Sequence, residues 1–213
     1  MKKYIKYLNL IIFTMGSQAL LYYLIKLFVS DFNVIHSIID IPLIKPFILF
    51  YDSWYPFIIL STYIVYKYDQ KQFNYMISAM LIGALLAQIT FILFPSMIIR
   101  PEIEINNIFD LMINLTYKSD NPPVNCFPSM HCVYCFVTSY YILRCKKLKP
   151  KYKLLITIFS LLIVLSTVFI KQHIVEDIAL AFIYTVMTII IVYLTKRNID
   201  ILFDFKKYIK STN

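Results

Sequence analysis

The stretch MISAMLIGALLAQITFILF, residues 76–94, contains no charged side chain. A helix needs about 20 mostly apolar residues to cross the hydrocarbon core of a bilayer, whereas a soluble helix keeps a polar face for water. The few polar residues of this stretch form no continuous polar face. The stretch therefore predicts a transmembrane helix and, with it, a membrane fold.

Further apolar runs repeat this pattern along the chain. The run LLITIFSLLIVLSTVFI, residues 154–170, is also uncharged. We expect one all-α membrane domain over residues 1–213, an integral bundle of about six transmembrane helices. The predicted spans are residues 6–29, 46–66, 73–94, 128–143, 152–171 and 173–195.

The composition agrees with a membrane protein and argues against other classes. The chain is 60% hydrophobic and 15% charged, against roughly 45–50% and about 25% in soluble domains. The formal net charge of +9 does not indicate nucleic-acid binding, because the cations lie between apolar runs and no groove-reading motif is present. We therefore expect membrane lipids, and no nucleic acid, as partners.

The cations also predict how the chain is oriented in the membrane. With the N-terminus in the cytoplasm, all but five of the 21 Lys and Arg residues fall on the cytoplasmic side, as the positive-inside rule requires. Both termini are therefore predicted to be cytoplasmic. The basic segment 198–213 is either a helix at the inner interface or a plain tail. The five exceptions are Lys26, Lys45, Arg100, Lys118 and Lys171.

Polar residues gather in three stretches at the predicted outer ends of spans, within residues 94–180. Ionisable groups at membrane depth are costly and mark candidate functional sites. An inward helix followed by an outward helix returns the chain to the same face, so His131 and His173 can meet there, and Arg100 can join them. The stretches are FPSMIIRP at 94–101, CFPSMH at 126–131 and KQHIVED at 171–177.

The residue types in these stretches suit phosphoryl transfer. His173 and Asp177 are four residues apart, so on a helix the carboxylate can orient the ring and leave the other nitrogen free to attack. Ser129 stands at a helix start, where a hydroxyl and unpaired N–H groups can hold phosphate oxygens. Arg100 and Lys171 add cations for the same anion.

The three stretches together resemble the motifs of the type-2 phosphatidic acid phosphatase superfamily, particularly its branch of fungal inositolphosphoryl-ceramide synthases. The matching motifs are Arg-Pro at 100–101, Pro-Ser-Met-His at 128–131, and Lys-Gln-His with an Asp four residues on at 171–177. The phosphatase branch usually has Lys seven residues before its motif Arg and Ser-Arg at the start of its third motif. Here Leu93 and Ser166-Thr167 stand at those places.

The resemblance implies a helical core like that of the phosphatidic acid phosphatases and haloperoxidases, and a role for each matching residue. His173 would be the nucleophile that forms a phosphohistidine, oriented by Asp177, and His131 would protonate the leaving group and later activate the acceptor. No metal or organic cofactor is implied. The phosphate would be bound by Arg100, Ser129 and Lys171.

Three functions follow from these motifs and stay open at the level of sequence. The first is a metal-independent lipid phosphate phosphatase or phosphotransferase at the extracytoplasmic face. The second is a transferase that passes an inositolphosphoryl or other headgroup to a lipid alcohol. The third is a catalytically silent membrane scaffold or transporter subunit that retains the fold.

The four cysteines could suggest a metal, because Cys132 and Cys135 form a Cys-x-x-Cys pair. A tetrahedral zinc site needs four ligands, and no second pair is spaced to supply them. We therefore expect the cysteines to pack in the apolar core, with a disulfide at Cys126 as the open alternative.

Overall fold

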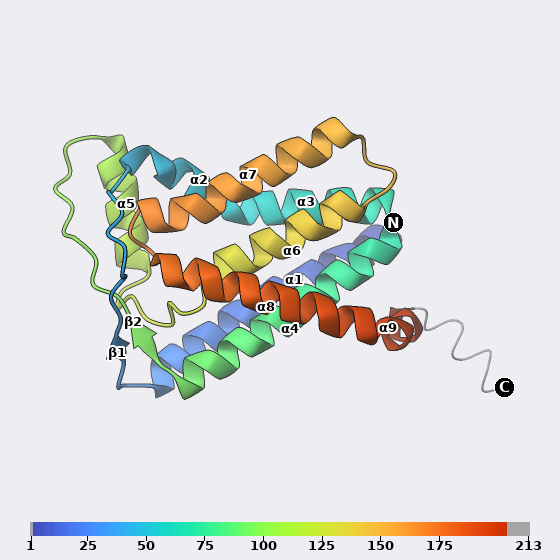
Figure 1. Ribbon diagram of the computed structural model, residues 1–213, viewed down its shortest axis with the longest axis horizontal. Coiled ribbons are helices and arrows are strands. Elements are labelled where there is room, and N and C mark those ends of the chain that lie inside the picture. Colours follow the sequence, from blue (N-terminus) through green and yellow to red (C-terminus); the bar gives the residue numbers. More distant parts are fainter. Residues whose placement is uncertain (1, 204–213) are drawn as a thin grey trace.

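The computed structural model describes residues 2–203 and is almost entirely helical (Figure 1). Its longer helices are α1 (Lys2–Phe28), α3 (Trp54–Tyr68), α4 (Gln70–Leu93), α6 (Met130–Arg144), α7 (Pro150–Phe169) and α8 (Val175–Leu194). The shorter elements are η1 (Lys45–Phe47), α2 (Ile48–Asp52), α5 (Ile108–Ser119), α9 (Lys196–Phe203) and the strands β1 (Asn33–Val34) and β2 (Ser96–Met97).

Four of these helices, α1, α4, α7 and α8, are long and apolar enough to cross a membrane. A fifth candidate is the pair formed by residues 45–52 and α3, which is bent by 41°. The bend falls at Ser53, beside the charged Asp52, in the predicted span 46–66. The all-α membrane bundle is thus confirmed, and its second span is broken rather than straight.

Helix α6, at the predicted span 128–143, differs from an ordinary span. It has 15 residues, which gives a length of about 22 Å against a hydrocarbon core of about 30 Å. It packs against α3, α4, α7 and α8, and Figure 1 shows it in the middle of the bundle. Because its neighbours enclose it, α6 need not match the thickness of the lipid.

The packing around α6 is close. Val133, Tyr134, Cys135 and Val137 are fully buried, and a Cβ placed on Gly83 of α4 would lie 2.9 Å from Cγ1 of Val133. A glycine is therefore what allows α4 to approach α6 at this level. The cysteines pack as predicted, since all four are buried and form no disulfide within residues 2–203.

Polar side chains set where several helices begin. Asp69 accepts a hydrogen bond from the Gln72 backbone N–H at 3.1 Å at the start of α4, and Asn107 does the same for two amides of α5. Pro150 occupies the first turn of α7, where its missing N–H costs nothing.

The connections at one end of the bundle form a small layer of their own (Figure 1). Strands β1 and β2 pair in parallel, with Asn33 opposite Ser96. Helix α5 lies within the connection 95–127, between α4 and α6. Lys45 binds the buried Asp110 of α5 at 2.7 Å, and this hydrogen bond lowers the pKa of the Asp110 carboxyl. The layer is thereby fixed to η1.

The start of α1 and helix α9 lie at the opposite end of the bundle (Figure 1). Residues 196–203 of the predicted basic tail are helical. The remainder of that tail, residues 204–213, lies outside the residues described.

Candidate active site

Two histidines from different segments of the chain meet beneath the α5 layer. His131 is in the first turn of α6, and His173 is in the turn that joins α7 to α8. Their ring centroids are 6.1 Å apart. The structure thus brings together the two rings that the hairpin topology predicted to meet.

A buried carboxylate orients the ring of His173. Its Nδ1 lies 2.8 Å from Oδ2 of Asp177, which also accepts the Ile174 backbone N–H at 3.1 Å. Asp177 is 0% exposed, so no bulk water competes for this oxygen. Because the carboxylate accepts a hydrogen bond from Nδ1–H, the lone pair of the other ring nitrogen, Nε2, is available for attack.

His131 is positioned by aromatic rings. It stacks on Tyr51 with ring centroids 4.5 Å apart and lies 4.4 Å from the ring of Trp54. Both rings come from the bent region where α2 meets α3. The bend that interrupts this span therefore supports a predicted catalytic side chain.

A cavity of about 290 Å³ lies in front of the two histidines. Its volume corresponds to roughly ten water molecules at about 30 Å³ each. It is lined mainly by aromatic rings, hydroxyls, amides and carboxylates. Among the lining residues are Tyr22, Tyr51, Asp52, Trp54, Tyr55, Thr116, Ser119, Asp120, Asn125, His131 and His173.

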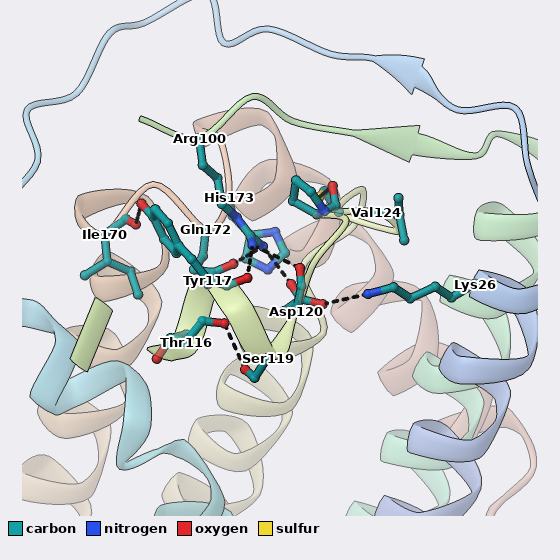
Figure 2. A network of polar contacts seen from close by, with 12 residues as sticks. Lys26, Arg100, Thr116, Tyr117, Ser119, Asp120, Val124, Ile170, Gln172 and His173 are labelled. Carbon is teal, nitrogen blue, oxygen red and sulfur yellow. Dashed lines mark hydrogen bonds and ion pairs between the residues drawn. The ribbon is translucent and has the colours of Figure 1, made fainter. Parts of the chain in front are cut away.

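Arg100 lies near His173, and its side chain is 7% exposed (Figure 2). It lines a separate cavity of about 540 Å³ and is not among the residues that line the cavity shared by the two histidines. Its guanidinium donates to the Asp120 carboxylate at 2.6 Å, to the Asp120 carbonyl at 3.0 Å and to Oε1 of Gln172. It also lies 5.0 Å above the ring of Tyr117. Gln172 is the neighbour of His173 in sequence, so this contact ties the arginine to the catalytic turn.

Tyr117 holds the α5 layer against the end of α7. Its hydroxyl donates to the carbonyl of Ile170 at 2.6 Å. Burial raises the pKa of Tyr117 to about 12, so the group remains a neutral hydrogen-bond donor at physiological pH.

The structure places the other two predicted phosphate ligands in different settings. Ser129 is 0% exposed and caps α6, with Oγ accepting from the Cys132 backbone N–H at 3.4 Å. Lys171 binds Asp40 at 2.9 Å, and this contact lowers the pKa of the Asp40 carboxyl. Lys171 and His173 both line a second cavity of about 300 Å³. His173 therefore borders both cavities.

Asp120 is the main feature that the motifs did not predict. In addition to Arg100, its carboxylate accepts the Tyr22 hydroxyl at 2.5 Å and lies 3.8 Å from Nζ of Lys26. Tyr22 and Lys26 belong to α1, about a hundred residues away in sequence. Asp120 stands in a polar Ser-Asp-Asn run that has no motif character, so no sequence signal marked it.

Several buried polar atoms around the histidines lack a hydrogen-bond partner within residues 2–203. They are Nε of Arg100, Nε2 of Gln172, both amide atoms of Asn125, Nε1 of Trp54 and Oδ1 of Asp177. Unpaired buried polar groups are uncommon and need an explanation. Most of these atoms are N–H donors, the groups that a ligand rich in oxygen acceptors requires.

The fold and the site together define a multi-pass helical membrane protein with a carboxylate-oriented histidine facing a second histidine and a buried arginine. The family model of the PAP2 superfamily matches residues 7–200, so the chain belongs to the PAP2 superfamily. Members of this superfamily are generally phosphatases or phosphotransferases that act on lipid phosphates in membranes. No curated protein and no solved structure matches the chain.

Proposed function

We propose that this chain is a lipid phosphate phosphatase or phosphotransferase that works through a phosphohistidine on His173. The observation that carries the proposal is the 2.8 Å contact between His173 and Asp177, opposite His131 and next to the buried Arg100. A membrane scaffold would have no use for a buried carboxylate that orients a histidine at the wall of a cavity.

In the first step, Nε2 of His173 attacks the phosphorus and the bond from phosphorus to the leaving oxygen breaks. His131 donates a proton to that oxygen, so the leaving group departs as an alcohol. Asp177 stabilises the positive charge that develops on the His173 ring. The product of this step is a phosphohistidine.

In the second step, His131 is neutral and accepts a proton from the acceptor hydroxyl. The acceptor oxygen attacks phosphorus, and the bond to Nε2 of His173 breaks. Both histidines then return to their starting protonation states. Water as acceptor gives a phosphatase, and an alcohol gives a transferase.

The phosphate oxygens are assigned to donors around the two rings. Arg100 supplies a guanidinium, and Ser129 with the first amides of α6 supplies the donors of a helix start. Lys171 contributes a cation once its exposed partner Asp40 is released. Aligned donors of this kind stabilise charge that develops in the transition state.

A transferase to an alcohol acceptor is the second candidate, as in the inositolphosphoryl-ceramide synthase-like branch. The sequence favours it, because Leu93 and Ser166-Thr167 stand where the phosphatase branch has its additional cations. Under both candidates, the active site faces the extracytoplasmic side, both termini are cytoplasmic and no metal is required.

Phosphate release from a panel of lipid phosphates, including an isoprenyl pyrophosphate, tests the proposal. The purified chain should release phosphate from at least one of them, and His173→Ala should not. His36→Ala is the histidine control, because His36 is exposed on the 29–44 connection and, although it lines the second cavity, it does not line the cavity that His131 and His173 share. A labelled, acid-labile phosphoprotein should form in the control and not in His173→Ala.

Failure of the whole panel would move the test to transfer between lipid phosphates and alcohol acceptors. If transfer also fails, and His131→Ala keeps the cellular role of the protein, the chain is a silent scaffold. The metal-independent mechanism would be contradicted if a chelator abolishes the activity while the same chelator, already saturated with metal, leaves the activity intact.

A further inference from the structure

In the proposed reaction the phosphorus lies between His131 and His173, and therefore in the cavity that both histidines line. The two cations of the motifs border other spaces: Arg100 lines the cavity of about 540 Å³, and Lys171 lines the second cavity of about 300 Å³. Within residues 2–203, no Lys or Arg lines the shared cavity. Phosphoryl oxygens that point into the shared cavity consequently need donors from uncharged side chains.

Asn125 offers such a donor in the wall of the shared cavity. The residue is 4% exposed, and neither its amide nitrogen nor its amide oxygen has a hydrogen-bond partner in the part of the chain that is described. A buried amide that stays unpaired destabilises the folded protein, so native structures rarely keep one without a reason. A ligand in the cavity would supply the missing partners.

The backbone of Asn125 is held in a conformation that most residues avoid. Its φ of 56° lies in the left-handed region, which asparagine tolerates better than other residues with a side chain. The conformation is held from β2, because the Asn125 backbone N–H donates to the Ser96 carbonyl at 2.8 Å and the Phe127 backbone N–H donates to the Ser96 hydroxyl at 3.4 Å. Ser96 is fully buried, so this anchor fixes Asn125 at the cavity wall.

Trp54 shows the same feature from a different element, the start of α3. It is 3% exposed, its Nε1 has no hydrogen-bond partner within the described residues, and it lines the shared cavity. Its ring lies 4.4 Å from that of His131. Among the described residues that line this cavity, Trp54 and Asn125 are the two with buried side-chain polar atoms that lack a partner. Two unused N–H donors from separate segments indicate a ligand that brings oxygen acceptors.

We propose that Asn125 binds the transferring phosphoryl group in the shared cavity, with the indole N–H of Trp54 as a second, neighbouring donor. The inference rests on the proposed function, in which His173 attacks that phosphorus. Nδ2 of Asn125 donates to a phosphoryl oxygen, and Oδ1 accepts the O–H of the hydroxyl that enters or leaves beside it. Such hydrogen bonds strengthen as negative charge grows on the phosphoryl oxygens in the transition state.

Asn125→Gly separates a binding role from a structural one, because the expected effects on stability and activity have opposite signs. Glycine adopts the left-handed conformation without strain and removes the unpaired amide, so the thermal unfolding temperature in detergent should stay equal or rise. The kcat/KM for the lipid phosphate that the starting chain turns over fastest should fall by about 10²-fold, mostly through kcat. Asn106→Gly removes an exposed asparagine from the same connection and should keep kcat/KM within about twofold.

Two further measurements address the donor itself. Asn125→Asp keeps the size of the side chain and its tolerance of the left-handed backbone but replaces the donor with a carboxylate, so it should lower kcat/KM at least as much as Asn125→Gly. Binding of a diacyl phosphatidate in micelles is followed through the fluorescence of Trp54, the single tryptophan of the chain. The His173→Ala chain is used so that the lipid is not consumed, and adding Asn125→Gly to it should weaken binding by about tenfold.

The role of Asn125 is overturned if Asn125→Gly or Asn125→Asp keeps kcat/KM within about twofold of the starting chain. It is also overturned if Asn125→Gly loses stability and activity together, since that result assigns the residue a structural role, or if the His173→Ala chain does not bind the phosphatidate. A starting chain that turns over no lipid phosphate, while Asn125→Gly still weakens phosphatidate binding, would instead refute the proposed function and leave the binding role of Asn125 in place.

Discussion

The two ends of the bundle contain ion pairs of similar chemistry in different surroundings. At the end that carries α5, Arg100 binds Asp120 at 2.6 Å and the arginine is 7% exposed. At the other end, Lys71 binds Asp200 at 3.0 Å, with side chains that are 64% and 42% exposed. A buried charge is costly and persists where it is paired or functional, whereas an exposed pair contributes little. Burial, more than pairing, distinguishes the candidate site from the opposite end.

The same contrast holds for a carboxylate that contacts an aromatic side chain. Asp177 lies 2.8 Å from His173 and is fully buried, while Asp200 accepts the Tyr75 hydroxyl at the same distance but is partly exposed. Only the first pair borders a cavity with a second histidine. The first pair is therefore expected to orient a reactive group, and the second to attach α9 to α4.

The largest expected effect on activity comes from substituting these two carboxylates, Asp177 and Asp200, one at a time. Asp177→Asn should lower the turnover rate by about 10²- to 10⁴-fold, because the ring of His173 loses its correct tautomer and the stabilisation of its charged form. Asp200→Asn should leave the rate within about twofold. Initial rates in detergent micelles measure both, and a comparable loss in the two variants would remove the distinction between the ends.

A somewhat smaller loss of activity is expected when Arg100, the cation of the buried pair, is substituted, and none is expected for Lys71, the cation of the exposed pair. Arg100→Lys should lower kcat/KM by about 10²-fold, because an ammonium cannot reproduce the fork of donors that the guanidinium directs at Asp120 and the phosphate. Lys71→Arg at the other end should have no effect on kcat/KM. Full activity of Arg100→Lys would show that the site needs only a positive charge.

The sequence predicted the parts of this molecule that depend on local pattern and on topology. Uncharged stretches such as 76–94 identified spans, and the hairpin between His131 and His173 implied that the two rings meet, as the 6.1 Å centroid separation bears out. These inferences needed only helix length and chain direction. The roles of the six predicted site residues remain proposals.

Features that depend on contacts between distant segments could not be predicted. Asp120 acquires its importance from Arg100, 20 residues away, and from Tyr22, 98 residues away. The stacking of His131 on Tyr51 joins α6 to the region where the chain bends at Ser53, 78 residues earlier, and no local pattern indicates that these two segments meet. Helix α5 is amphipathic and short, so no apolar run indicated it.

Gly83 tests whether the centre of the bundle transmits strain to the candidate site. Gly83→Ala should destabilise the protein by about 1–3 kcal/mol, because the new methyl group would meet Val133 of α6 at 2.9 Å. Val133 lies two residues after His131, so activity should fall as well. Thermal unfolding in detergent, together with the turnover rate, measures both effects.

Gly16→Ala is the matched control, since a Cβ placed on Gly16 of α1 would have no neighbour within 4 Å among the residues described. Alanine favours a helix over glycine by about 0.5–1 kcal/mol, so this variant should be neutral or slightly more stable. Equal destabilisation by the two substitutions would argue that the fold does not depend on the close approach of α4 to α6.

The smallest effect is expected at the exposed ion pair. Lys71→Ala should change the free energy of unfolding by less than about 0.5 kcal/mol, because an exposed pair gains little Coulomb energy and must order two long side chains. The small stabilisation that the pair gives the starting chain should weaken further as salt rises from 0.1 to about 0.5 M, where the screening length falls below about 5 Å. Unfolding of Lys71→Ala and the starting chain at both salt concentrations measures this. A salt-insensitive loss of more than about 2 kcal/mol would mean that the pair behaves like a buried one, and the contrast between the two ends would then rest on their chemistry rather than on burial.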